Sequence, residues 1–210
     1  MNESTANSRI AATAHIISDI FSPLMIPTYT TAIVLWYTIL RFLPIGIKLW
    51  ALAGTLFITA IVPALVIFIL LRMGKVSDMS ISNKSQRTLP YCASIACYIG
   101  AGCFMSSMQA PSWLVAFFYG AAIVSLLSLV ITHWWKISAH TGGVGGMAAA
   151  CYWLALHNLL AWPLLWISLS FAIVGAVAWA RIYLSHHTPL QVLAGASMAF
   201  IVEFITLSIL

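Results

Sequence analysis

Long apolar runs alternate with short polar links along the whole chain. A bilayer core of about 30 Å requires roughly 20 residues of α-helix, and seven runs approach this length. The first run contains Pro23 and Pro27, so we expect a kink within it. We predict seven helical spans, at about residues 14–41, 49–72, 91–107, 113–132, 141–157, 162–183 and 189–209.

This pattern predicts an all-α fold, a polytopic transmembrane helix bundle of six or seven spans. No composition break divides the chain, so we expect one integral membrane domain over residues 1–210, with a motif-bearing core at about 75–210. The first apolar run is too long for the apolar region of a signal peptide and lacks a small-residue cleavage site. We therefore expect the N-terminus to be kept.

Polar residues are concentrated in three of the links. These links read KVSDMSISNKSQRTLP (75–90), HWWKISAHT (133–141) and ARIYLSHHTPLQ (180–191). In a count of seven spans they follow the second, fourth and sixth spans, so all three emerge on the same side of the membrane. We therefore predict a single site to which all three links contribute.

Composition limits the possible partners. The chain is 62% hydrophobic and 6% charged, with a net charge of +5, far from the usage of soluble domains. No basic stripe with interleaved aromatic residues is present, so we expect anionic lipids of the bilayer, and not nucleic acid, as partners. We expect an integral membrane protein of a bacterial inner membrane; the sequence leaves the oligomeric state open.

The three links together carry many cations and imidazoles but almost no acid. Asp78 is the one carboxylate among them, which disfavours Mg²⁺ or Ca²⁺ sites. One guanidinium group can bind two phosphate oxygens at once, and lysine adds a point charge, so this composition favours a phosphate site. The groups are Lys84, Arg87, Lys136 and Arg181 with His133, His140, His186 and His187.

Histidine can carry out phosphoryl transfer without a metal. One neutral imidazole attacks phosphorus to give a phosphohistidine, while a second, protonated imidazole gives its proton to the departing alkoxide. Zinc on His140, His186 and His187 is disfavoured because the adjacent cations would repel it. We therefore expect neither a metal nor another cofactor. Ser138 is expected to begin a helix, whose N-terminal amides favour an anion.

The order of these segments resembles the type 2 phosphatidic acid phosphatase family, integral membrane phosphatases of lipid phosphates related to the vanadium haloperoxidases. A Lys/Arg/Pro segment is followed by Ser-x-His and then by Arg-x5-His, over residues 84–191. The resemblance implies a phosphatase whose substrates include phosphatidic acid, phosphatidylglycerophosphate, polyprenyl diphosphate and lipid A. The sequence does not choose among them.

The third family motif, Ser-Arg-x5-His-x3-Asp, is similar to ARIYLSHHTPLQ. This implies that Arg181 binds phosphate and that His187 is the nucleophile, with His186 the rival in the adjacent register. Gln191 stands where the family has an aspartate that orients the nucleophilic imidazole. A glutamine carbonyl can accept the Nδ1 hydrogen but cannot stabilise an imidazolium by charge, so slower catalysis or substitution by Asp78 is implied.

The other two motifs match less closely. ISAH is similar to Pro-Ser-Gly-His, which implies phosphate contact by Ser138 and acid catalysis by His140. NKSQRTLP matches Lys-x6-Arg-Pro loosely and implies that Lys84 and Arg87 bind phosphate. Two other readings stay open: a catalytically weak lipid-phosphate binder or transporter, and a histidine metal protein.

Several residues outside the motifs have structural interpretations. His15 and Asp19 are four residues apart on one helix and can pair with each other. Glu203 lies in the last apolar run, where a charge is costly. The glycines at 142, 143, 145 and 146 favour close helix packing, with backbone contact to phosphate as the alternative.

The side of the membrane that the site faces is left open. Most Lys and Arg residues outside the spans lie on the motif side, which by the positive-inside rule faces the cytoplasm. The proposed ligands account for much of that excess, however, and the family resemblance implies an outward-facing site.

Overall fold

A computed structural model describes residues 3–78, 81 and 83–209, with side chains from residue 8 onward. All regular elements in this part of the chain are helical. The α-helices are α1 (Glu3–Ile20), α2 (Ile26–Tyr37), α3 (Ile45–Leu56), α4 (Val62–Arg72), α5 (Thr88–Ser107), α6 (Ser112–Trp134), α7 (Ala139–Leu156), α8 (Pro163–Tyr183) and α9 (Pro189–Ile209). Shorter elements are the 3₁₀ helices η1 (Ile39–Phe42) and η3 (Lys84–Gln86) and the π-helical turn η2 (Phe57–Ile61).

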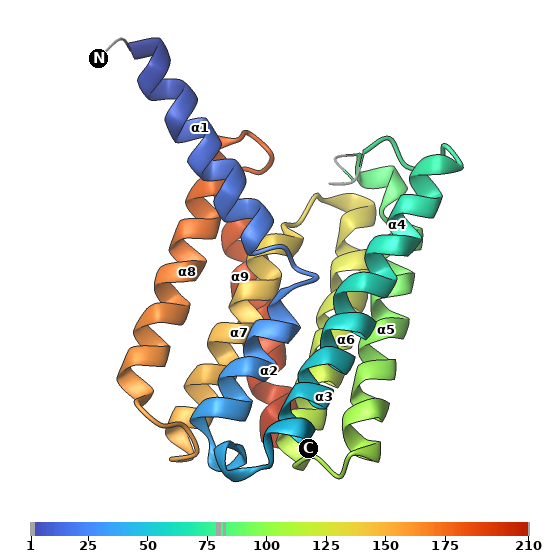
Figure 1. Cartoon of the computed structure of the whole chain (residues 1–210). Coiled ribbons are helices and arrows are strands. Elements are labelled where there is room, and N and C mark those ends of the chain that lie inside the picture. The colour runs from blue at the N-terminus through green and yellow to red at the C-terminus, as the bar shows by residue number, and fades with distance from the viewer. Residues whose placement is uncertain (1–2, 79–80, 82, 210) are drawn as a thin grey trace.

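The prediction of an all-α transmembrane bundle is confirmed. Five helical stretches are long and apolar enough to cross a bilayer: residues 45–72, α5, α6, α8 and α9. The α7 helix and the broken α1–α2 pair run alongside them, which gives seven passes through the bundle (Figure 1). The chain is therefore a membrane protein.

The first predicted span differs from the observed helices. The chain leaves the helical path after Ile20 and α2 begins at Ile26, so a five-residue linker holding Pro23 separates two helices. The α1 helix also begins at Glu3, well before the predicted start, and extends beyond the rest of the bundle in Figure 1. The length of apolar runs does not predict this part of α1, because polar and apolar residues are mixed along it.

The second span is continuous from Ile45 to Arg72 but changes winding in its middle. The π-helical turn at Phe57–Ile61 lies just before Pro63, which has no backbone N–H to donate to the preceding turn. Proline is accepted there because it sits in the first turn of α4.

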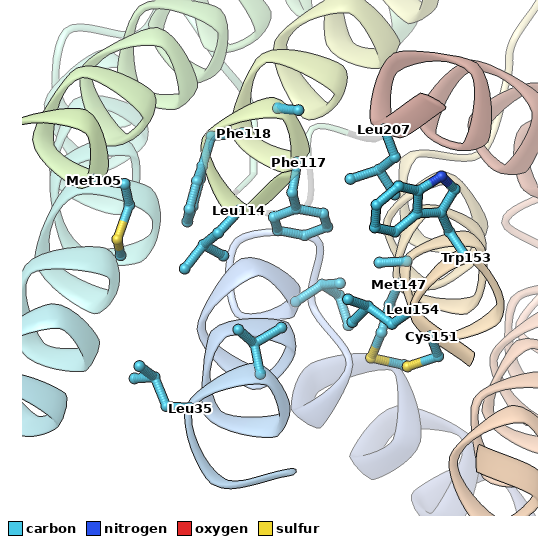
Figure 2. Packing of buried hydrophobic residues seen from close by; sticks show 14 of the residues in the cluster. Leu35, Met105, Leu114, Phe117, Phe118, Met147, Cys151, Trp153, Leu154 and Leu207 are labelled. Atoms are coloured by element: carbon cyan, nitrogen blue, oxygen red, sulfur yellow. The ribbon is translucent and has the colours of Figure 1, made fainter. Parts of the chain in front are cut away.

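The hydrophobic core lies toward the end of the bundle away from the three polar links. Figure 2 shows Leu35 of α2, Met105 of α5, Phe117 of α6, Trp153 of α7 and Leu207 of α9 meeting there. Each of these residues lies in the half of its helix that is farther from the polar links. Packing at one end therefore holds the helices while the opposite end carries polar groups.

Close packing of α7 against α9 depends on small residues. A methyl group placed on Gly145 would lie 2.5 Å from the Ala196 carbonyl oxygen, and one on Gly195 would lie 2.6 Å from that of Ser138. The prediction that the glycines of α7 permit close packing is confirmed at Gly145. This contact sets the start of α7 directly beside the start of α9.

Candidate functional site

The three polar links meet at one end of the bundle. The guanidinium Nη1 of Arg87 donates to the Ile137 carbonyl at 3.1 Å, which joins the first link to the second. The Nζ of Lys136 donates to the His186 carbonyl at 2.9 Å, which joins the second link to the third. The structure therefore places together the three links that the span count assigned to one side.

A cavity of about 330 Å³ lies below these links, and we call it the central cavity. Four of the predicted site residues line it: Arg87, His140, Arg181 and His187. The end of α1 and the following linker contribute several polar residues to the wall, α4 contributes the apolar Ala64 and Ile67, and α5 contributes both kinds. The cavity thus combines two guanidinium groups, two imidazoles and an apolar wall.

The turn after α8 explains why Arg181 and His187 are neighbours. Ser185 adopts a left-handed backbone with φ of 55°, the Ser185 amide donates to the Ile182 carbonyl at 2.9 Å, and the His186 amide donates to the Arg181 carbonyl at 3.1 Å. These two bonds form a Schellman motif, which ends a helix and reverses the chain. The five-residue spacing therefore returns His187 to the last turn of α8.

A capping box then fixes the start of α9. The Thr188 hydroxyl accepts from the Gln191 amide at 3.4 Å, and the Gln191 Oε1 accepts from the Thr188 amide at 3.2 Å. Pro189 occupies the first helical position, where its missing N–H costs nothing. The side chain of Gln191 is thus held in one place by the helix start itself.

Gln191 also orients the ring of His187. Its Oε1 lies 3.0 Å from the His187 Nδ1. A backbone amide can only donate, so the bond from Thr188 identifies this atom of Gln191 as the oxygen, and Nδ1 must carry the hydrogen. The lone pair of His187 is therefore on Nε2, as a nucleophile requires.

Burial keeps His187 neutral. Its side chain is 7% exposed, and burial lowers the pKa of its imidazole to about 3, against the opposing effect of the Gln191 hydrogen bond. The cations Lys136, Arg87 and Arg181 lower the pKa further. At neutral pH the ring is uncharged in the unliganded protein.

Both arginines of the central cavity are buried and donate their hydrogen bonds to neutral groups. Arg87 is 6% exposed and donates to the carbonyls of Ile81 and Ile137; Arg181 is 5% exposed and donates to the Ser18 hydroxyl at 2.7 Å. The Nε of Arg181 has no hydrogen-bond acceptor among the described residues. Asp19 lines the same cavity and interacts electrostatically with Arg181, but one carboxylate does not balance two guanidinium groups. Buried cations are costly without a counter-charge, so this arrangement favours a further anion.

His140 occupies the first turn of α7. Ser138 is the N-cap of that helix, and its hydroxyl accepts from the Thr141 amide at 3.4 Å, so the predicted helix start is confirmed. The ring of His140 makes no hydrogen bond to a described side chain or carbonyl and lines the central cavity. It is therefore available to a bound molecule.

Two residues predicted to contact phosphate lie elsewhere. Ser138 is 1% exposed, its hydroxyl serves α7 as a cap, and it is absent from the lining of the central cavity. Lys84 lies on η3 at the surface, where its Nζ reaches the Trp134 carbonyl at 3.5 Å, and it also lies outside that lining. Of the two cations of the first link, Arg87 therefore lines the central cavity and Lys84 does not.

His186, the alternative nucleophile, is also outside the central cavity. Its side chain is partly exposed, and burial, Arg181 and Lys136 lower the pKa of its imidazole. The geometry therefore favours His187 over His186 as the residue that faces a ligand.

The sequence did not reveal the wall formed by α1 and its linker. Ser18, Asp19 and Ser22 line the central cavity, as does Tyr91 of α5, whose buried hydroxyl has no hydrogen-bond partner in the described chain. Asp19, for which the four-residue spacing predicts a pairing with His15, lies at this cavity and interacts electrostatically with Arg181; the pairing itself stays a prediction. The polar pattern Ser-Asp-x-x-Ser just before Pro23 could have indicated that this segment faces a polar site.

Comparison with models of known protein families, with curated proteins and with solved structures gives no match to this chain. Among the described residues, no three His, Cys, Asp or Glu side chains are grouped so that they could hold a metal ion.

Proposed function

We propose that the protein is a metal-independent lipid phosphate phosphatase, of the type 2 phosphatidic acid phosphatase kind, that removes a terminal phosphate from a lipid mono- or diphosphate. One observation carries the proposal: two buried arginines and two imidazoles share one cavity, and a guanidinium N–H there has no acceptor. A phosphate group would supply both the missing charge and the missing acceptor.

The first half of the proposed reaction forms a phosphohistidine. The Nε2 lone pair of His187 attacks phosphorus, the bond from phosphorus to the lipid oxygen breaks, and His140 gives its proton to that oxygen. Arg87 and Arg181 stabilise the charge on the phosphoryl oxygens as the transition state forms. The negative charge of the bound phosphate favours the protonated His140 that this step requires.

The second half returns the enzyme to its starting state. A water molecule gives a proton to His140 and attacks phosphorus, the bond between phosphorus and Nε2 breaks, and inorganic phosphate leaves. Gln191 holds Nδ1–H throughout, which keeps Nε2 directed at phosphorus. The oxygen of Gln191 has no full charge, so it stabilises the cationic phosphohistidine less than a carboxylate would.

A lipid substrate agrees with the position of the cavity. The central cavity lies where the helices meet the polar links, and Ala64 and Ile67 of the span at 45–72 form part of its apolar wall. A headgroup can lie among the cations while its chains lie between helices. Five apolar helices are long enough to cross a membrane, and we propose a bacterial inner membrane as the location.

A second candidate function is a lipid-phosphate binder or transporter with weak catalysis. It is favoured by Gln191 in the orienting position and by the absence of Lys84 and Ser138 from the central cavity. In this case the same cations would hold the headgroup, and the phosphohistidine step would be slow or absent.

Release of inorganic phosphate from mixed lipid phosphates, measured with excess chelator present, tests the proposal. Turnover that resists the chelator supports the phosphatase. Tight binding of lipid phosphate without turnover would replace it with the binder or transporter. Turnover that disappears with the chelator and returns with added metal would contradict the metal-independent mechanism.

A further inference from the structure

A second cavity lies beside the central one, at the same end of the bundle. Its volume is about 290 Å³, and η3, the first residue of α5 and the last two turns of α6 line it. Arg87 belongs to the lining of both cavities. We call this space the side cavity; apart from Arg87, the proposed reaction uses none of its residues.

The side cavity has an excess of unused hydrogen-bond donors. Lys84 lines it, and its ammonium has one long hydrogen bond of 3.5 Å, to the Trp134 carbonyl, which leaves most of its donor capacity free. The Nε and Nη1 of Arg87 donate to two backbone carbonyls, and the guanidinium group also lies close to the Tyr91 hydroxyl; its Nη2 carries further N–H groups. Two cations therefore border this space.

The start of α5 adds backbone donors to the same space. Thr88 is the first residue of α5 and lines the side cavity, and the amides of Thr88 and Leu89 have no backbone acceptor within the described chain. The residue before them, Arg87, provides no side-chain cap, and no acidic residue lies in the first turn. The positive end of a 20-residue helix is thus left without a counter-charge.

A buried hydroxyl adds to the polar groups that border this space. Thr132 of α6 lines the side cavity and is 4% exposed; its Oγ1 makes no hydrogen bond within 3.5 Å to a described residue, and the hydroxyl of Tyr91, which also lacks one, lies next to it. A buried hydroxyl without a partner is costly, so an acceptor within the cavity would stabilise the structure. The two cations, the uncapped amides and this hydroxyl can all donate hydrogen bonds to a negatively charged group bound in the side cavity.

We propose that the side cavity is a second phosphate-binding site, held by Lys84, Arg87, Thr132 and the N-terminus of α5. Its ligand is a phosphate group distinct from the one in the central cavity. Two sources share this chemistry: the second phosphate of a lipid diphosphate whose terminal phosphate lies in the central cavity, and the headgroup phosphate of a neighbouring anionic lipid. Arg87 contacts both sites in either case.

Binding of ³²P-labelled inorganic phosphate to the full chain in a phosphate-free detergent counts the sites. Lys84→Ala combined with Thr132→Val changes two residues that line the side cavity and do not line the central one, and valine keeps the volume of threonine, so we expect the fold to be kept. Lys75→Ala is the matched control, because it removes the same charge from an exposed lysine of the same link that lines neither cavity. Arg181→Ala removes a ligand of the central cavity alone.

We expect two phosphates per wild-type chain and per Lys75→Ala chain. The double variant should keep the phosphate of the central cavity and bind that of the side cavity about tenfold or more weakly, as loss of a charged hydrogen bond implies. Arg181→Ala should lose the phosphate of the central cavity and keep that of the side cavity. Binding in the double variant equal to that of the wild type overturns the proposal while leaving the central site intact. If the double variant loses one phosphate and Arg181→Ala loses none, the result supports a phosphate site in the side cavity and argues against one in the central cavity.

Two further measurements identify the source of the phosphate group. In nanodiscs of phosphatidylcholine with phosphatidylglycerol, native mass spectrometry should show a retained phosphatidylglycerol that the double variant loses if a neighbouring lipid fills the cavity. If the substrate fills it, the KM for farnesyl diphosphate rises about tenfold in the double variant, whereas the KM for phosphatidic acid is unchanged. This second arm rests on the proposed function. No change in either measurement contradicts the proposal.

Discussion

The Nδ1 of His187 lies 3.0 Å from the Oε1 of Gln191, and that oxygen also accepts from the Thr188 amide that begins α9. One glutamine therefore caps a helix and selects the tautomer of the imidazole that faces the central cavity. Capping boxes accept glutamate as well as glutamine at this position, so the structure tolerates a charge there.

Gln191→Glu should keep the capping box and add a carboxylate beside His187. An adjacent negative charge favours the imidazolium, so we expect the pKa of His187 to rise by about one unit or more, as seen by NMR titration of the labelled ring. Turnover of a lipid phosphate should be kept or increased, because the carboxylate stabilises the cationic intermediate. An unchanged pKa would mean that the two side chains do not interact in the membrane.

Gln191→Leu keeps a side chain of similar size but should remove both the cap of α9 and the hydrogen bond that orients His187. We expect kcat to fall about a hundredfold or more, because nothing then selects the Nδ1–H tautomer. Stability should fall by about 1 kcal/mol through loss of the cap. Full activity in this variant would show that His187 does not require orientation by residue 191.

The buried, neutral His187 should make stability depend on pH. The pKa of His187 is about 3 in the folded protein, below its ordinary value of about 6.5. Between these values the unfolded chain binds a proton and the folded chain does not, so stability is complete above about pH 6.5 and falls as pH decreases.

We expect the midpoint of thermal unfolding to be lower at pH 5 than at pH 7.5, and the difference to shrink in His187→Gln. The difference that remains in the variant belongs to other groups, His186 among them. An equal loss in variant and wild type would mean that His187 is not buried in its neutral form.

Ser18→Ala tests the contact between α1 and α8. The variant leaves the Arg181 Nη1 without its 2.7 Å acceptor, which should cost about 1–3 kcal/mol of unfolding free energy. Added phosphate should then raise the melting temperature more than in the wild type, because it replaces the lost acceptor. Ser22→Ala is the control, a serine of the same wall that does not pair with Arg181; similar behaviour of both variants would exclude the Ser18 contact.

Gly145→Ala should weaken the packing of α7 on α9. Its methyl group would lie 2.5 Å from the Ala196 carbonyl oxygen, a backbone atom that cannot rotate away, so we expect a loss of about 1–3 kcal/mol. Gly175→Ala in α8 is the matched control, since its methyl group meets nothing within 4 Å and should be neutral or stabilising by up to about 1 kcal/mol. Denaturation in mixed micelles compares the two; equal losses would contradict this packing.

Apolar length predicted most of the fold because each span must be about as long as the bilayer is thick. It missed the break at residues 21–25 and the early start of α1, since Glu3 to Thr13 form a mixed sequence whose helix is not required to cross lipid. The glycines lower the apolarity of α7, yet their packing on α9 makes it one of the central helices.

The site was predictable where local motifs fix the backbone. The Schellman turn and the capping box bring Arg181, His187 and Gln191 together within one short segment, and Thr-x-x-Gln was a readable sign of that box. The contribution of Ser18 was not predictable, because it depends on how α1 lies against α8. The sequence did not show that Lys84, on the 3₁₀ helix η3, lines the side cavity beside Arg87 and not the central one; its contact with phosphate stays a prediction.

The most direct test of the central claim is a search for phosphate on His187. Chain incubated with ³²P-labelled lipid phosphate and quenched in alkali should carry label that is stable to base, labile to acid, and located on the peptide that contains residue 187. His187→Ala should lose both the label and the turnover, whereas His186→Ala, one residue away and outside the central cavity, should keep both. Turnover in His187→Ala equal to that of the wild type would contradict the account.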